Sequence, residues 1–147
     1  MVVSRTGANN YENLPDRHSD AEILVNTTPV GMWPKLEGSP VDLRLLPKVS
    51  AVVDVIYNPG RTNLLLQAEE IGHWQRMPGY ETSEPGERHI RYTGGLSMLV
   101  AQAKRAEELF FDKAISDGET EKITAQLWRD RTNIVLVGMP GSGKTTV

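Results

Sequence analysis

The stretch Ala51-Val-Val-Asp-Val-Ile-Tyr57 consists mainly of β-branched and other apolar residues, and Asn58-Pro-Gly60 follows it directly. Such a run predicts a strand, and Asn-Pro-Gly is typical of the turn that ends one. The next stretch, Thr62 to Ile71, predicts a helix, because its leucines and alanine share one side and its glutamates lie on the other. A strand, a short turn and a helix form the unit from which parallel sheets are built.

The same alternation continues on both sides of this unit. Met1 to Arg5 has the composition of a strand end, and Ala21 to Val25 predicts a further strand. Apolar residues recur at three- and four-residue steps over 96–110, which predicts an amphipathic helix that we expect to end at Asp117-Gly118. Thr120 to Trp128 predicts a second, shorter helix. Strands that alternate with helices predict an α/β fold, here a partial Rossmann-like parallel sheet with C-terminal helices.

Between these elements lie segments without a regular period. Gly7 to Asp20 is polar and rich in turn residues, and Trp33 to Pro40 is irregular because prolines and glycines interrupt it. His73 to His89 mixes prolines and glycines with charged residues, and we interpret it as an inserted surface loop. Arg129 to Arg131 is interpreted as a linker to the last segment of the chain.

Composition excludes several classes of function. The 147 residues carry a net charge of −3 and no block of lysine or arginine, so we expect no nucleic-acid partner. The absence of cysteine excludes disulfides and thiolate chemistry, and the three histidines have no metal-ligand spacing. No apolar stretch approaches the roughly 20 residues of a membrane span, and no signal-peptide pattern opens the sequence. A soluble cytoplasmic protein is therefore expected, and no pattern indicates an oligomeric state.

A phosphate-binding motif lies near the end of the sequence. Residues 132–146 read Thr-Asn-Ile-Val-Leu-Val-Gly-Met-Pro-Gly-Ser-Gly-Lys-Thr-Thr, which satisfies the spacing G-x-x-x-x-G-K-T after an apolar strand-like run. The motif predicts an ATP site in which Lys144 reaches the terminal phosphates and the Thr145 hydroxyl binds Mg²⁺. The predicted phosphate-binding residues are Gly138, Gly141, Ser142, Gly143, Lys144, Thr145 and Thr146. Because the sequence stops one residue later, we expect a nucleotide-binding domain that is cut off.

Four other features have both a functional and a plain structural interpretation. Arg5 after a strand suits the 2′-phosphate of NADP, or is a solvated surface residue. Asn26-Thr-Thr-Pro-Val-Gly-Met32 either lets a planar cofactor approach the backbone or forms a simple turn. Asp54 is expected to point away from Tyr57 and either caps a neighbouring backbone or belongs to a site. Gln102, two turns into the predicted helix, is either a ligand-binding amide or a surface residue.

Taken in order, four segments resemble one enzyme family. Val3 to Thr6, Leu24 to Met32, Val53 to Pro59 and Gly94 to Ala103 are similar to the C-terminal half of shikimate dehydrogenases, a resemblance that covers roughly residues 1–128. The sequence from 133 to 146 resembles the opening of a shikimate kinase, which acts on the next step of the same pathway. The resemblance implies a dehydrogenase part at 1–130 and a truncated kinase part at 131–147.

The resemblance also implies cofactors, substrates and site residues. The family reduces 3-dehydroshikimate to shikimate with NADP, and the kinase part would use ATP and Mg²⁺. Its Asn-Arg-Thr adenosine-phosphate clamp falls on a segment that has serine in the first position. The implied NADP-binding residues are Ser4, Arg5, Thr6, Asn26, Thr27, Val30, Val55 and Gly95, and the implied substrate-binding residues are Tyr57 and Gln102. No residue of this chain is expected to be catalytic, because the family carries its lysine–aspartate pair in an N-terminal substrate domain.

These implications leave two alternatives to an enzyme. We expect the chain by itself to be inactive, because it lacks both that substrate domain and the glycine-rich turn that holds a pyrophosphate. It could instead be a non-enzymatic module that binds a nucleotide or a partner. It could also be an unstable gene fragment, because an incomplete sheet exposes an unpaired edge and an apolar face.

Overall fold

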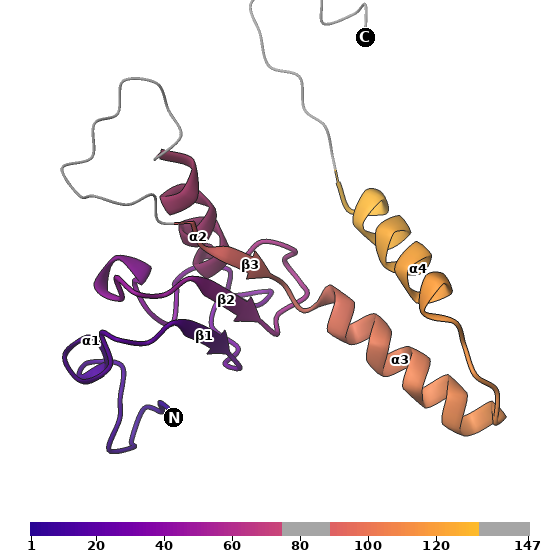
Figure 1. Cartoon of the computed structure of the whole chain (residues 1–147), viewed down its shortest axis with the longest axis horizontal. Helices are drawn as coiled ribbons and strands as arrows, with labels where there is room; N and C mark the ends of the chain where they lie inside the picture. The colour runs from indigo at the N-terminus through magenta and orange to yellow at the C-terminus, as the bar shows by residue number, and fades with distance from the viewer. Residues whose placement is uncertain (75–88, 133–147) are drawn as a thin grey trace, which may run out of the picture.

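A three-stranded parallel sheet forms the centre of the computed structural model, which describes residues 1–74 and 89–132 (Figure 1). Strand β1 (Ile23–Asn26) pairs with β2 (Ala51–Asp54), and β2 pairs with β3 (Arg91–Thr93), so the strand order is β1-β2-β3. In this register Asn26 lies opposite Asp54. The predicted α/β fold with a parallel sheet is confirmed.

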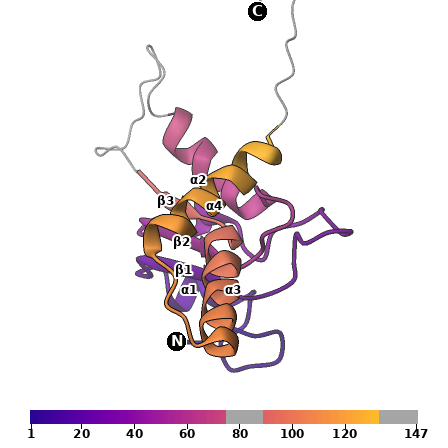
Figure 2. The same cartoon turned by 90° about the vertical axis from the view of Figure 1, so that its right-hand side faces the viewer.

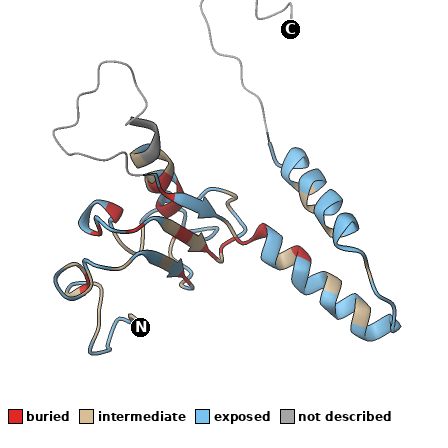
Figure 3. Cartoon of the chain, in the orientation of Figure 1, coloured by how far each residue is buried: buried red, intermediate tan, exposed pale blue. Residues whose placement is uncertain are grey.

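One face of the sheet carries the apolar core. Helix α2 (Asn63–Trp74) packs against β2 and β3, and the short segments α1 (Leu14–Arg17) and η1 (Leu43–Leu45) complete the layer. Figure 3 places most buried residues around β2, α2 and the start of α3. The buried core consists of Leu14, Leu43, Leu46, Val49, Val52, Leu64, Leu65, Ala68 and Ile90. The opposite face is more open, because Ile23 and Val25 of β1 are 64% and 54% exposed.

Two helices leave the sheet as an antiparallel hairpin. Helix α3 (Leu96–Phe111) and helix α4 (Asp117–Asp130) lie side by side and extend away from the strands (Figures 1 and 2). The predicted amphipathic helix is confirmed, but only Leu96 and Val100 of its apolar residues are buried. Leu109 and Phe110 near its C-terminal end are 68% and 85% exposed. The apolar stripe therefore contacts the core only through the first turns of α3.

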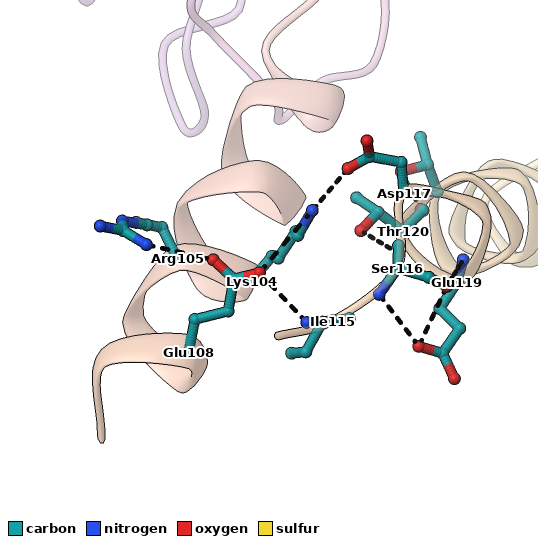
Figure 4. A network of polar contacts seen from close by, with 9 residues as sticks. Lys104, Arg105, Glu108, Ile115, Ser116, Asp117, Glu119 and Thr120 are labelled. Carbon is teal, nitrogen blue, oxygen red and sulfur yellow. Dashed lines mark hydrogen bonds and ion pairs between the residues drawn. The ribbon is translucent and has the colours of Figure 1, made fainter. Parts of the chain in front are cut away.

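Helix α4 begins where the sequence was expected to end a helical region. The Ser116 hydroxyl accepts a hydrogen bond from the Glu119 amide, and the Glu119 carboxylate accepts one from the Ser116 amide (Figure 4). This reciprocal capping box satisfies two amides that an uncapped helix leaves without partners. The prediction that Asp117-Gly118 ends the region is wrong, because the Ser-x-x-Glu pattern starts a helix there. Arg129, expected in a linker, lies within α4.

An ion pair and a hydrogen bond hold the hairpin together. Lys104 Nζ on α3 lies 2.5 Å from Asp117 Oδ1 on α4 and 3.8 Å from Glu108 Oε1 (Figure 4). The Ile115 amide donates a hydrogen bond of 3.1 Å to Glu108 Oε1. That hydrogen bond lowers the pKa of Glu108, and the bond from Lys104 lowers the pKa of Asp117. The bond to Asp117 raises the pKa of Lys104 in turn.

We expect the hairpin to loosen in acid. Both carboxyl groups have a pKa that folding lowers, so their stabilising contribution is complete above roughly pH 5 and is lost as the pH falls through the lowered values. The protection of the Ile115 amide against hydrogen exchange, measured by NMR, should fall over that acidic range. In Glu108→Gln this pH dependence should be much weaker. An Ile115 amide whose protection follows the same acid profile in both proteins would contradict the prediction.

Several boundaries differ from the sequence-based expectations. Met1 to Arg5 is not a strand, because the chain turns there and the Ser4 amide donates to the Asn9 carbonyl at 3.1 Å. Strand β2 ends at Asp54 rather than Tyr57, so the strand alternation that was expected to separate their side chains does not reach Tyr57. Strand β3 was not predicted, because all three of its residues are exposed and show no alternation of polarity.

Some predictions lie outside the described residues. Most of the proposed insertion from His73 to His89 falls there, although α2 itself extends to Trp74. The strand and phosphate-binding loop expected at 133–147 also fall there, together with the end of the 131–147 segment. Within 1–74 and 89–132, no helix combines the length and apolarity that a bilayer span requires.

Candidate functional site at the carboxyl edge of the sheet

Parallel strands bring their carboxyl ends to one edge of the sheet, which is where open α/β sheets bind ligands. Here the edge is formed by Asn26 at the end of β1, Asp54 at the end of β2 and the Gly94-Gly95 turn after β3. Three of the residues singled out from sequence, Asn26, Val55 and Gly95, meet at this edge.

A buried polar cluster holds the edge together. Asp54 is fully buried, and its Oδ1 accepts hydrogen bonds of 3.1 Å from Asn26 Nδ2 and from the Ile56 amide. Its Oδ2 accepts a bond of 2.6 Å from Thr62 Oγ1, which lies immediately before α2. Of the two interpretations of Asp54, the buried carboxyl that caps a neighbouring backbone is confirmed. The cluster joins β1, β2 and the start of α2, so it is the scaffold of the edge.

The loop after β1 is a turn stabilised by its own side chains. Asn26 Oδ1 accepts hydrogen bonds from the Thr28 amide at 3.0 Å and from Thr28 Oγ1 at 2.8 Å. The Val30 amide donates to Thr28 Oγ1 at 3.3 Å. These bonds make an Asx-type turn, in which short polar side chains replace backbone partners. Thr27 remains exposed at the tip of this turn, and Val30 is half-buried behind it.

Gly95 brings the start of α3 into contact with the end of β2. A Cβ atom at Gly95 would lie 2.0 Å from the Val55 carbonyl oxygen, and the Gly95 amide donates a 2.9 Å bond to the Ile56 carbonyl. The φ angle of Gly95 is −76°, which any residue adopts, so it is space and not backbone conformation that requires glycine here.

A cavity of about 650 Å³ lies beside this contact. Tyr57 borders it from the loop after β2, and Trp128 and Arg131 border it from the C-terminal end of α4. Arg131 Nη1 donates a 2.9 Å hydrogen bond to the Tyr57 carbonyl, and its guanidinium carbon lies 5.9 Å from the centre of the Tyr57 ring. The described residues that line the cavity include two arginines and no aspartate or glutamate, the lining being Ile56, Tyr57, Pro59, Gly60, Arg61, Leu65, Tyr92, Thr93, Gly94, Gly95, Leu96, Trp128, Arg131 and Thr132.

The remaining predicted residues lie elsewhere. Gln102 is exposed on α3 and is not among the residues that line this cavity. Ser4, Arg5 and Thr6 occupy an exposed N-terminal turn. The preceding residue, Val3, borders a second cavity of about 310 Å³ that also reaches Asn26, Thr27 and Thr28. The N-terminal turn thus adjoins the loop after β1 without entering the larger cavity.

The predicted nucleotide residues 138–146, including the Mg²⁺ ligand Thr145, lie outside the described residues. Within the described ranges, no three histidine, aspartate or glutamate side chains gather into a metal-binding group.

Three residues of the site were not found from the sequence. Thr62 follows the pattern of a helix N-cap, so its position before the predicted helix was a usable signal. Trp128 and Arg131 carry no such signal, because Arg131 meets Tyr57 across 74 positions of sequence. Only the return of α4 along α3 brings them together.

Comparison with known proteins gives one consistent relationship. The chain is 34% identical over 100 residues to the shikimate dehydrogenase (NADP(+)) of Clostridium beijerinckii, which covers 68% of this chain and 30% of that protein. Among solved structures, shikimate dehydrogenase 1 of Peptoclostridium difficile superposes with a TM-score of 0.69 at 28% identity, over 90% of this chain and 44% of that one.

The chain is similar to part of a shikimate dehydrogenase.

A further solved relative, shikimate 5-dehydrogenase of Listeria monocytogenes in complex with shikimate and NAD, has a TM-score of 0.55 at 26% identity over 77% of this chain and 34% of that one. No protein-family model matches the chain. The chain spans about a third of the length of the curated relatives it matches. The Rossmann-like α/β fold of shikimate dehydrogenases is therefore present over the described residues, in agreement with the resemblance of the sequence.

Proposed function

We propose that residues 1–130 form the NADP-binding part of a shikimate dehydrogenase. The observation that carries this proposal is the junction of Val55 and Gly95 at the carboxyl edge of the sheet, next to the Asn26–Thr28 turn. This edge is the usual ligand position in an open α/β sheet, and similarity to NADP-dependent shikimate dehydrogenases favours the same ligand.

Two exposed side chains and one half-buried side chain near this edge suit a dinucleotide. Val55 is half-buried, so a flat ring could lie against its side chain, while the buried Gly95 keeps the start of α3 close behind it. Thr27 is exposed in the turn after β1 as a hydroxyl donor. Arg5 is exposed on the N-terminal turn, and its guanidinium suits the 2′-phosphate that distinguishes NADP from NAD. When bound, the nicotinamide would supply hydride chemistry.

The contribution of this chain to the reaction would be binding and orientation. Tyr57, which lines the larger cavity, offers a phenol that can donate to an oxygen of shikimate. Gln102 offers an exposed amide from α3. We expect the groups that transfer the proton to come from outside this chain, so that Tyr57 and Gln102 position the substrate without exchanging its proton.

We further propose that 131–147 is the start of a nucleotide-binding domain of the shikimate kinase type. The spacing of Gly138, Gly143, Lys144 and Thr145 supports it. Lys144 would hold the terminal phosphates of ATP, and Thr145 would hold Mg²⁺.

Arg5→Gln should weaken binding of NADP⁺ but not of NAD⁺. A charged hydrogen bond to the 2′-phosphate accounts for roughly 1.5–3 kcal/mol, so we expect the dissociation constant for NADP⁺ to rise about 10- to 100-fold. Calorimetric titration of the 147-residue chain with each dinucleotide measures both constants. Arg129→Gln, which removes an exposed arginine of α4, is the matched control and should leave both unchanged.

The same titrations separate the proposal from its main alternative. Equal binding of NADP⁺ to wild type and Arg5→Gln would show that Arg5 does not contact the 2′-phosphate. Failure of the wild-type chain to bind NADP⁺, together with ATP binding that Lys144→Ala abolishes, would favour a non-enzymatic nucleotide-binding module.

A further inference from the structure

The loop that carries Tyr57 is held by hydrogen bonds to three consecutive carbonyl groups. The Ile56 carbonyl accepts from the Gly95 amide at 2.9 Å, and the Asn58 carbonyl accepts from the Trp33 amide at 3.1 Å. Between them, the Tyr57 carbonyl accepts from Arg131 Nη1 at 2.9 Å. The three donors come from the start of α3, the loop after β1 and the end of α4. The conformation of this loop therefore depends on three distant parts of the chain.

Arg131 differs from the other two donors because it acts through a side chain. Its guanidinium reaches Tyr57 twice, through the carbonyl and through the ring, whose centre lies 5.9 Å from the guanidinium carbon. A cation over an aromatic face at this distance is attracted to it. The two contacts together restrain both the backbone and the ring of Tyr57.

The end of α4 is itself held against the cavity. The Arg131 amide donates to the Trp128 carbonyl at 3.3 Å, so the helical turn continues as far as Arg131. A Cβ at Gly60 would lie 3.4 Å from the Trp128 ring, so this ring packs against the loop after β2. Trp128 thus anchors the helix end from which Arg131 reaches Tyr57.

We propose that Arg131 is a positioning residue that holds Tyr57 in its substrate-binding orientation. The inference rests on the proposed function, in which Tyr57 contacts shikimate. Because β2 ends at Asp54, no strand pairing fixes Tyr57, and the bond from Arg131 takes the place of a ladder bond. The C-terminal end of α4 is in this way part of the substrate side of the site, although Arg131 itself does not have to touch the substrate.

The test compares Arg131→Ala, Arg131→Lys and Arg129→Ala in the 147-residue chain. The NMR signals of the Tyr57 ring report its orientation, and titration with shikimate reports binding. In Arg131→Ala we expect the Tyr57 signals to move and the dissociation constant for shikimate to rise about tenfold, because a hydrogen bond and a cation–π contact are lost. Arg131→Lys retains a cation and a donor and should recover part of both. Arg129→Ala removes an arginine two positions away and should change neither.

The outcomes separate this inference from the proposed function. Tyr57 signals that stay at their wild-type positions in Arg131→Ala would overturn the positioning role, whatever the ligand. Unchanged shikimate binding in Arg131→Ala, with wild-type binding intact, would overturn it as well. If the wild-type chain binds no shikimate, Tyr57 is not a substrate contact and Arg131 has no substrate role. This holds even if the Tyr57 ring signals respond to Arg131→Ala.

Discussion

Gly95→Ala is expected to destabilise the chain by about 3 kcal/mol or more, a large share of the 5–15 kcal/mol typical of a folded domain. The added Cβ would lie 2.0 Å from the Val55 carbonyl oxygen and 2.5 Å from the Val55 carbonyl carbon. Both atoms belong to the backbone at the end of β2, so no side chain can rotate to make room. The start of α3 would have to move away, and the 2.9 Å bond from the Gly95 amide to the Ile56 carbonyl would be lost.

Two other glycines are matched controls for this prediction. At Gly94 the nearest atom to an added Cβ is the Gly60 carbonyl oxygen at 3.4 Å, so Gly94→Ala should cost little. Gly118 lies within α4 with no heavy atom within 4 Å of an added Cβ, and Gly118→Ala should stabilise the helix by roughly 0.5–1 kcal/mol. Urea denaturation followed by circular dichroism measures all three. Equal stability of Gly95→Ala and Gly94→Ala would contradict the close contact with Val55.

This contact changes how the resemblance of Gly95 to a cofactor-binding residue is understood. The resemblance implied that Gly95 lies near the nicotinamide of the cofactor. The structure supplies a separate reason, since the Val55 carbonyl occupies the space of a side chain. A loss of cofactor binding in Gly95→Ala would therefore follow from displacement of α3 even without a direct clash with the cofactor. Arg5→Gln is the cleaner probe of the cofactor, because Arg5 is exposed.

The regular elements were predictable where a local pattern was strong. The β-branched run from 51 and the helical spacing after Thr62 gave β2 and α2, with errors of a few residues at their ends. Strand β3 was not predicted because its three exposed residues form a strand only by pairing with β2, which is a tertiary effect. The strand predicted for Met1 to Arg5 was wrong for the opposite reason. An apolar composition does not make a strand unless the segment pairs with another strand.

The candidate site was predictable only in part, because its contacts are long-range. Asn26 was singled out by a turn motif and Gly95 by the family resemblance, and the sheet brings both to its carboxyl edge. The sequence left Asp54 with two interpretations, and only its contacts to Asn26 and Thr62 decide between them. Arg131 was interpreted as part of a linker, and no local pattern could relate it to Tyr57. Local sequence thus predicts which residues follow a strand, whereas the fold decides which of them meet.

Asp54→Ala is expected to be the second strongly destabilising change, with a loss of about 3–5 kcal/mol in the free energy of unfolding. Asp54 is 0% exposed and accepts hydrogen bonds from Asn26, Ile56 and Thr62. Alanine would leave the Asn26 amide group and the Ile56 amide buried without an acceptor. Each such donor costs roughly 1–3 kcal/mol, and the cavity left by the carboxyl group adds to this cost. Chemical denaturation of the full chain measures the loss.

Asp54→Asn and Asp42→Ala distinguish the hydrogen bonds of Asp54 from a general effect of losing an aspartate. An asparagine at 54 can still accept from the Ile56 amide and can donate to Thr62 Oγ1, so we expect a loss of only about 1–2 kcal/mol. Asp42 is exposed and accepts one bond from the Arg44 amide, so its replacement should cost no more than about 1 kcal/mol. If Asp54→Ala were no more destabilising than Asp42→Ala, the cluster would not hold β1, β2 and α2 together. The carboxyl edge would then owe its shape to the apolar core beneath it.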